Sequence, residues 1–130
     1  ELRCWGWNQQ GVLGNDAYPD GSAVPVKVLD GVSSVSQGLY HACAVMRSGG
    51  VMCWGDNEHG ELGNDDIADS TTPVAVLNLT QVAQVSVGTS HTCALKKNGE
   101  VWCWGDNTVK QLGGGSTDTK SRVPVQVQGL

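Results

Sequence analysis

The sequence predicts an all-β fold made of repeated four-stranded antiparallel units, for three reasons. The tripeptide Cys-Trp-Gly occurs at residues 4–6, 53–55 and 103–105, so the chain repeats with spacings of 49 and 50 residues. Apolar residues within a repeat alternate over short segments, and no segment sustains a helical period. Gly, Asn, Asp, Ser and Thr interrupt the chain about every 8–12 residues. Four-stranded units near this length are the blades of β-propellers.

Each element of the repeat can be placed from residues that keep the same phase. These residues include Leu13-Gly14, Leu62-Gly63 and Leu112-Gly113, and also Pro25-Val26, Pro73-Val74 and Pro124-Val125. One strand is expected at 2–7, followed by a fourth strand of the same blade. The second unit is expected to have strands at 32–37, 41–46, 51–55 and 73–77, and the third at 82–87, 91–96, 101–105 and 124–127.

The chain therefore divides into a half blade at 1–30 and two blades at 31–80 and 81–130, about two and a half blades of one incomplete propeller. We expect the remaining blades to come from a longer chain or from other copies. The N-terminus has no Met and no signal-peptide core, which indicates a mature, excised or truncated chain.

The third repeat carries a resemblance to a known family. Its segment HTCALKKNGEVWCWGDN, followed by QLG and VPVQV, resembles the repeat of the regulator of chromosome condensation family. The resemblance covers all three copies and implies a seven-bladed propeller. The cysteines beside the His and the Trp-Gly depart from the intracellular members and resemble a cysteine-bearing subgroup of extracellular propellers.

Composition excludes several classes of protein. With 16% charged residues and a formal net charge of −5, the chain lacks the basic stripe of a nucleic-acid binder. No apolar run approaches the roughly 20 residues of a membrane span. A hydrophobic content of 39% with five Trp excludes a disordered chain.

Four of the five cysteines are expected to form disulfides within the blades. Three-residue turns at 47–49 and 97–99 set Cys43 opposite Cys53, and Cys93 opposite Cys103, at a separation that suits a disulfide. Zinc ligation by cysteine and histidine, or free buried thiols, remain the alternatives at this stage. Disulfides imply an oxidising compartment, hence a secreted or extracellular protein. Cys4 would then be unpaired within this chain, because the repeat places its expected partner before Glu1.

The other repeated side chains are interpreted as structural. Trp5, Trp54 and Trp104 are expected to pack between neighbouring blades, with Gly55 and Gly105 beside them. His41 and His91 are expected to tie a strand to a neighbouring loop, because an active site needs one constellation and not one copy per blade. Trp7 and Trp102 are not repeated and are weaker candidates for exposed contact.

Two motifs suggest modification or metal binding. Asn78-Leu79-Thr80 is an N-glycosylation sequon in an expected surface loop. The acidic stretch 56–61 superficially resembles a calcium loop, but its spacing fails the required pattern, and turn chemistry explains it. We therefore expect no metal and no cofactor.

The loops at 15–23, 64–72 and 114–122 vary between repeats and are candidates for partner binding. Their charged residues are Asp16, Asp20, Asp65, Asp66, Asp69, Lys120 and Arg122. No catalytic set and no phosphate loop is present, so we expect a non-enzymatic extracellular module that binds a protein or has a structural role. The resemblance adds two alternatives: an inhibitor of a secreted enzyme such as a β-lactamase, and a guanine-nucleotide exchange factor for a small GTPase.

Overall fold

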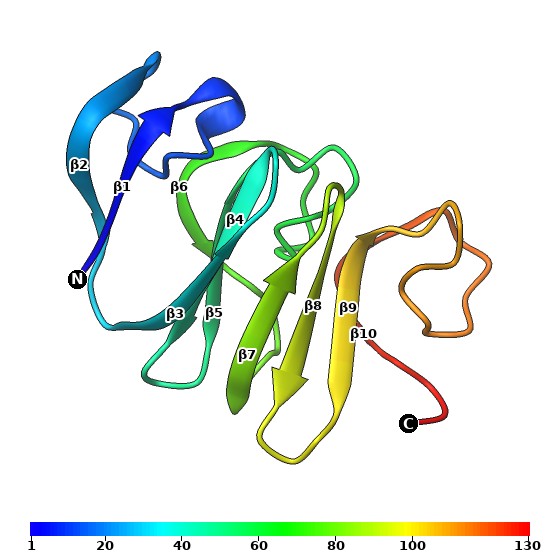
Figure 1. Cartoon of the computed structure of the whole chain (residues 1–130). Helices are drawn as coiled ribbons and strands as arrows, with labels where there is room; N and C mark the ends of the chain where they lie inside the picture. The colour runs from blue at the N-terminus through cyan, green and yellow to red at the C-terminus, as the bar shows by residue number, and fades with distance from the viewer.

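Three antiparallel sheets follow one another along an arc in this computed structural model, which describes residues 1–130 (Figure 1). A two-stranded sheet comes first, followed by two four-stranded sheets. The strands are β1 (Leu2–Trp7), β2 (Gly21–Leu29), β3 (Val32–Gln37), β4 (His41–Met46), β5 (Val51–Gly55), β6 (Ser70–Ala75), β7 (Val82–Val87), β8 (His91–Lys96), β9 (Val101–Asp106) and β10 (Lys120–Gln126). The all-β prediction of four-stranded antiparallel blades is confirmed.

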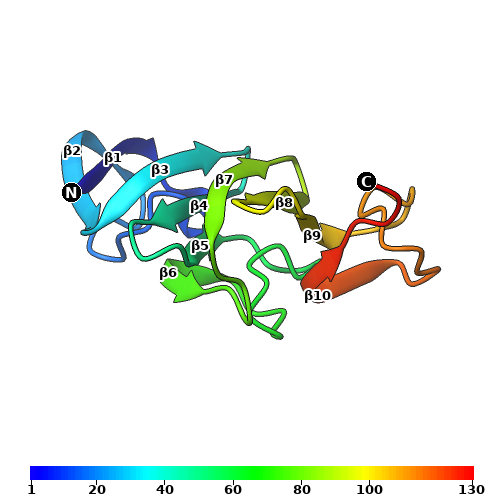
Figure 2. The same cartoon turned by 90° about the horizontal axis from the view of Figure 1, so that it is seen from below.

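Strand order within each full sheet follows the chain. The order is β3-β4-β5-β6 in one sheet and β7-β8-β9-β10 in the next, and β1 pairs with β2 in the first. Figure 2 shows the sheets from below, with β1 and β2 at one end of the arc and β9 and β10 at the other. The connections between sheets lie at residues 30–31 and 76–81.

The central hairpin of each blade has the register expected from the sequence. Cys43 lies opposite Cys53, and Cys93 lies opposite Cys103. Gly49 and Gly99 adopt positive φ angles of 91° and 90° in the two turns, a conformation that costs glycine nothing. The predicted turn chemistry therefore fixes which residues face each other across the hairpin.

The fourth strand of each blade begins earlier than expected. β6 starts at Ser70 instead of residue 73, and β10 starts at Lys120 instead of residue 124. The register of each pair shifts between the first residues and those around the Pro, because proline cannot donate to the ladder and a bulge accommodates the extra residues. Lys120 and Arg122, expected in a loop, therefore lie on a strand.

One short element was not expected. Gln9–Gly11 form a 3-10 helix, η1, directly after β1. Its Gly11 comes so close to Thr71 that a Cβ atom there would lie 2.7 Å from the Thr71 Cα. The helix thus packs the first blade against β6 of the second.

The larger hydrophobic core lies between the two full blades. It includes Leu62, Val82, Val85 and Trp104 together with the Cys43 and Cys53 pair. A smaller core, around Val12 and Trp54, joins the half blade to the second sheet. The structure contains no helix with the length and apolar character needed to span a membrane.

Candidate interaction surface

A buried asparagine follows the Trp-Gly position in every repeat and organises the loop after it. These residues are Asn8, Asn57 and Asn107. Each side-chain oxygen accepts a hydrogen bond from the backbone N–H of the repeat leucine five residues later, at 2.7, 2.9 and 3.2 Å respectively.

The amide group of the same asparagine holds the far side of the loop. Asn57 Nδ2 donates to the carbonyl oxygens of Asp66 and Ala68, at 3.1 and 3.0 Å. The turn chemistry expected for residues 56–61 does not predict this role of Asn57. The signal was present, because Asn8 stands at the same repeat position as the other two.

The tryptophans at the shared repeat position of the two full blades join each blade to the one before it. Trp54 Nε1 donates to the carbonyl oxygen of Val12 at 2.9 Å, and Trp104 Nε1 donates to that of Glu61 at 2.6 Å. Both indoles are completely buried. Trp5 differs from the expectation: its side chain is 64% exposed, because no sheet packs against the first blade on that side.

His41 also joins two blades, although its partner is a strand residue and not the loop that we expected. Its Nε2 lies 2.8 Å from Thr92 Oγ1 on β8. The Thr92 hydroxyl donates to the Glu61 carbonyl oxygen, so it accepts from a protonated His41 Nε2. His41 Nδ1 is then a buried acceptor without a partner. His91 lies on the outer sheet, where it is half-buried.

Glu61, within the acidic stretch 56–61, is a fully buried carboxylate, and sequence alone does not predict this burial. Its oxygens accept a hydrogen bond from the His59 backbone N–H at 2.8 Å and lie 3.1 Å from His59 Nδ1. Burial raises the pKa of Glu61, and the nearby Asp56 adds to that effect. The matching positions are Val12 and Gln111, so a comparison of the repeats marks Glu61 as unusual.

The cysteines lie as their repeat positions suggest. Disulfides join Cys43 to Cys53 and Cys93 to Cys103, each with a Cα–Cα distance of 4.1 Å. Cys4 is a free, half-buried thiol on β1, and burial raises its pKa. No group of three or more His, Cys, Asp or Glu side chains is arranged to hold a metal ion.

The glycines that follow the tryptophans allow strands to approach closely. Gly55 and Gly105 have φ angles of 106° and 102°. A Cβ at Gly55 would lie 2.3 Å from the Tyr40 carbonyl oxygen, and one at Gly105 would lie 2.6 Å from that of Ser90. Any larger residue would clash with backbone atoms there.

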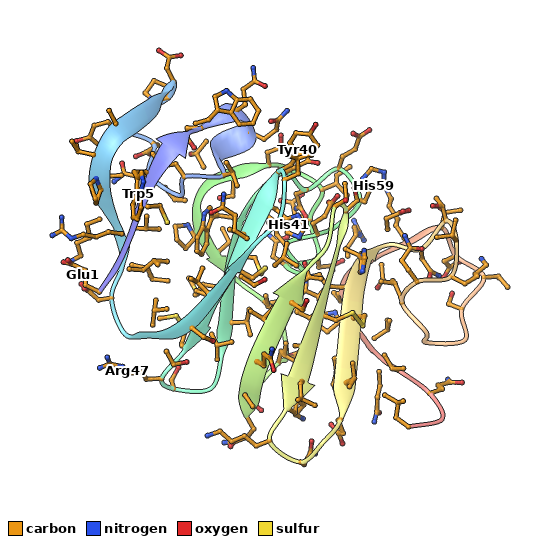
Figure 3. The ribbon with its side chains drawn as sticks, in the orientation of Figure 1. Glu1, Trp5, Tyr40, His41, Arg47 and His59 are labelled. Atoms are coloured by element: carbon orange, nitrogen blue, oxygen red, sulfur yellow. A yellow bond between two sulfur atoms is a disulfide. The ribbon has the colours of Figure 1, made fainter.

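Charge is strongly divided between the two ends of the blades. We term the end formed by residues 7–23, 55–72 and 105–122 the loop face. It carries ten of the thirteen acidic residues and three of the eight basic ones, a net charge of −7, while the rest of the chain carries +2. Tyr40 and His59 lie at the end of the loop face and Arg47 lies at the opposite end (Figure 3).

The five aspartates predicted to contact a partner are exposed on the loop face: Asp16, Asp20, Asp65, Asp66 and Asp69. The two basic residues on the same list have partners within the chain. Arg122 Nη2 lies 3.1 Å from the Asp65 carboxylate, and Lys120 Nζ donates to the Glu58 carbonyl oxygen at 3.2 Å. These two residues therefore connect the second and third blades.

The two tryptophans outside the repeat differ in exposure. Trp7 is 52% exposed at the loop face. Trp102 is half-buried against the larger core, its Nε1 donates to Glu100, and Lys96 Nζ lies 5.7 Å from the centre of its ring. Asn78 of the sequon is exposed in the turn after β6, with a φ of 53°.

Comparison with protein-family profiles gives a clear match. The regulator of chromosome condensation (RCC1) repeat matches residues 48–95 and 98–130, and a second profile of the same repeat matches 32–61 and 82–111. A search of curated proteins found no match.

Solved structures share the fold. Human WBSCR16 aligns with a TM-score of 0.81 and 26% identity over 95% of this chain and 32% of its own. Prp20p from Saccharomyces cerevisiae, described with its binding to Gsp1p and histones, aligns with a TM-score of 0.78 and 21% identity over 96% of this chain and 33% of its own. The chain thus spans about a third of the length of these structures.

Proposed function

The chain belongs to the regulator of chromosome condensation (RCC1) repeat family, and from this we propose that it is a non-enzymatic protein-interaction module of an oxidising, extracellular setting. One observation carries the proposal. The same cross-strand cysteine pair occurs at the same register in both full blades. Disulfides persist in secreted and extracellular proteins and are rare in the cytosol and nucleus.

The surface of the blades supports binding more than catalysis. Loops on a rigid scaffold present side chains with little loss of conformational freedom, and here buried asparagines hold the loops from within. His41 bonds to Thr92 between two blades and His59 pairs with Glu61, so neither is paired with a nucleophile. An acidic loop face with exposed apolar side chains is available for a partner.

The disulfide argument also separates this proposal from nucleotide exchange on a nuclear GTPase, which takes place in a reducing compartment. The binding to Gsp1p and histones is a property of Prp20p. At 21% identity that likeness supports the fold, and we do not extend the partner to this chain.

Thiol titration tests the proposal. The protein is exported to the bacterial periplasm, purified without reductant and denatured in the presence of a thiol reagent. We expect one reactive thiol, Cys4, before reduction and five after it. Five reactive thiols in the unreduced protein would refute the extracellular assignment.

Two assays distinguish the alternatives. Stimulated nucleotide release from a small GTPase would favour an exchange factor, and inhibition of a class A β-lactamase would favour an inhibitor. We expect neither activity from the purified chain.

A further inference from the structure

Two exposed aromatic residues lie in the first segment of the loop face, residues 7–23. Trp7 is 52% exposed and Tyr18 is 40% exposed. Trp7 pairs with Gly21 across the first sheet, and the Gly21 backbone N–H donates to the Tyr18 carbonyl oxygen at 3.0 Å. Trp7 therefore ends β1, and Tyr18 begins the turn that leads into the partner strand β2. Tryptophan and tyrosine are the residue types most enriched among those that dominate binding energy at protein interfaces.

A groove is lined by the residues that follow these two aromatic residues in the chain. It has a volume of about 370 Å³ and lies between η1 and the loops of the first and second blades. Asn8, which follows Trp7, and Pro19, which follows Tyr18, line it. Asp16 and Asp69 line it from the two loops, and carbon atoms form most of the rest of its wall. The groove is large enough to receive one extended polar side chain.

The carboxylates at this groove have no cation to balance them. The three basic residues of the loop face are engaged elsewhere: Lys110 with the Thr117 carbonyl oxygen, Lys120 with that of Glu58, and Arg122 with Asp65. Asp16 and Asp69 form no ion pair within the chain. Burial raises the pKa of Asp56, and the neighbouring Asp69 raises it further, as expected where two carboxyl groups lie close together.

We propose that this groove, with Trp7 and Tyr18 beside it, receives a lysine or arginine side chain of a protein partner. The inference rests on the proposed function and names the chemistry of the partner. A guanidinium or ammonium group would balance the charges of Asp16 and Asp69, and the aromatic rings would contact its aliphatic stem or an apolar neighbour. The negative loop face would also speed the approach of a basic segment.

Selection from a random peptide library tests the inference. A phage-displayed library of dodecapeptides is panned on the intact immobilised protein, and the strongest binder is synthesised for affinity measurement. We expect recovered peptides to be enriched in Lys and Arg. Binding of the synthetic peptide is expected to weaken by about tenfold or more between about 0.05 and 0.5 M salt.

Variants locate the binding. Asp16→Asn with Asp69→Asn keeps the oxygen of residue 69 that accepts from the Asn57 backbone N–H, so the loop is preserved. This double variant, and separately Trp7→Ala, should each weaken binding by about tenfold or more. Asp30→Asn, an exposed aspartate at the opposite end, is the matched control and should leave affinity within about twofold.

The outcomes separate this inference from the function on which it rests. Peptides without basic enrichment, or basic peptides that bind the double variant as tightly as the parent, would overturn the inference and leave an interaction module with another surface. Failure to select any peptide would count against both. Loss of binding in the Asp30 control as well would overturn it, since attraction would then depend on net charge and not on the groove.

Discussion

At the scale of single residues, the buried asparagine after each Trp-Gly supplies hydrogen bonds to backbone groups of the loop that follows. In a strand or helix, regular backbone pairing would supply these bonds. Asn57 offers one acceptor and two donors, and the loop backbone uses all of them. An apolar residue at this position would leave buried backbone groups unpaired. A buried polar residue inside a loop thus contributes to the stability of the fold, as an apolar core residue does.

Replacing Asn57 should therefore destabilise the fold strongly. We expect Asn57→Ala to lower the free energy of unfolding by about 2–3 kcal/mol, because several buried hydrogen bonds lose a partner. Asn98→Ala, at an exposed turn position with one bond to the Glu100 N–H, should cost less than about 1 kcal/mol. Urea unfolding monitored by tryptophan fluorescence measures both, and equal losses would argue against the role of Asn57.

His41 should make the stability depend on pH. Burial, with a smaller contribution from His91, lowers its pKa to about 4 from the ordinary 6.5. The unfolded chain then binds more protons, so stability is complete above about pH 6.5 and falls as the pH drops towards 4. At about 1.4 kcal/mol per pH unit, the loss amounts to about 3 kcal/mol.

The test is urea unfolding of parent and His41→Gln protein between pH 7.5 and 4.5. The variant should lose much of the decline, because glutamine can still donate to Thr92 and does not titrate. Glu61 opposes the effect, since its raised pKa adds stability at low pH. His59→Gln, which removes the half-buried neighbour of Glu61, is the control. An unchanged slope in His41→Gln would show that another group carries the pH dependence.

At the scale of elements, the repeat predicted the bounds of the strands that follow simple alternation and placed the start of the proline-containing strands β6 and β10 too late. The central hairpins could be placed to the residue, because Gly49 and Gly99 define both turns. β6 and β10 begin earlier than expected, because a bulge before the proline breaks the alternation on which the prediction relied.

The candidate site was less predictable than the strands. The acidic loop residues and Trp7 could be named from the sequence, but the groove between Asp16 and Asp69 depends on how two blades meet. Similarly, Lys120 and Arg122 look like free loop charges until β10 is placed beside the second blade. The spacing of the repeat predicts the strands within a blade, but it does not predict which side chains meet between blades.

The contact between blades can be tested at one repeat position in two environments. Trp104→Phe removes a buried indole N–H that donates to Glu61 and leaves space in the larger core. We expect a loss of about 2–3 kcal/mol in unfolding free energy. Trp5→Phe, at the equivalent but 64% exposed position, should change stability by less than about 0.5 kcal/mol. Similar losses would contradict the assignment of this tryptophan to blade packing.

At the scale of the whole molecule, each blade protects the hairpin of the blade before it. Thr92 Oγ1 on β8 lies 4.0 Å from Cys43 Sγ, and Val85 on β7 belongs to the core that contains Cys43 and Cys53. Both cysteines are fully buried. Cys93 of the next blade is half-buried on the outer sheet. Packing along the arc therefore makes two chemically identical disulfides unequal in exposure.

This difference predicts the order of reduction. Under native conditions with a limiting phosphine reductant, Cys93 and Cys103 should become alkylated before Cys43 and Cys53, because reductant reaches the half-buried Cys93 first. Mass spectrometry of alkylated peptides measures the order. In denaturant the two pairs should be reduced at similar rates, and a difference that persisted there would contradict protection by blade packing.

This chain forms blades of the RCC1 type, and we propose that the central hairpin of each full blade is joined by its own disulfide in an oxidising compartment. Disulfide mapping tests it most directly: the exported protein is digested without reductant at acidic pH, and the linked peptides are identified by mass spectrometry. We expect links from Cys43 to Cys53 and from Cys93 to Cys103. Links between blades, or reduced cysteines at these four positions, would contradict it.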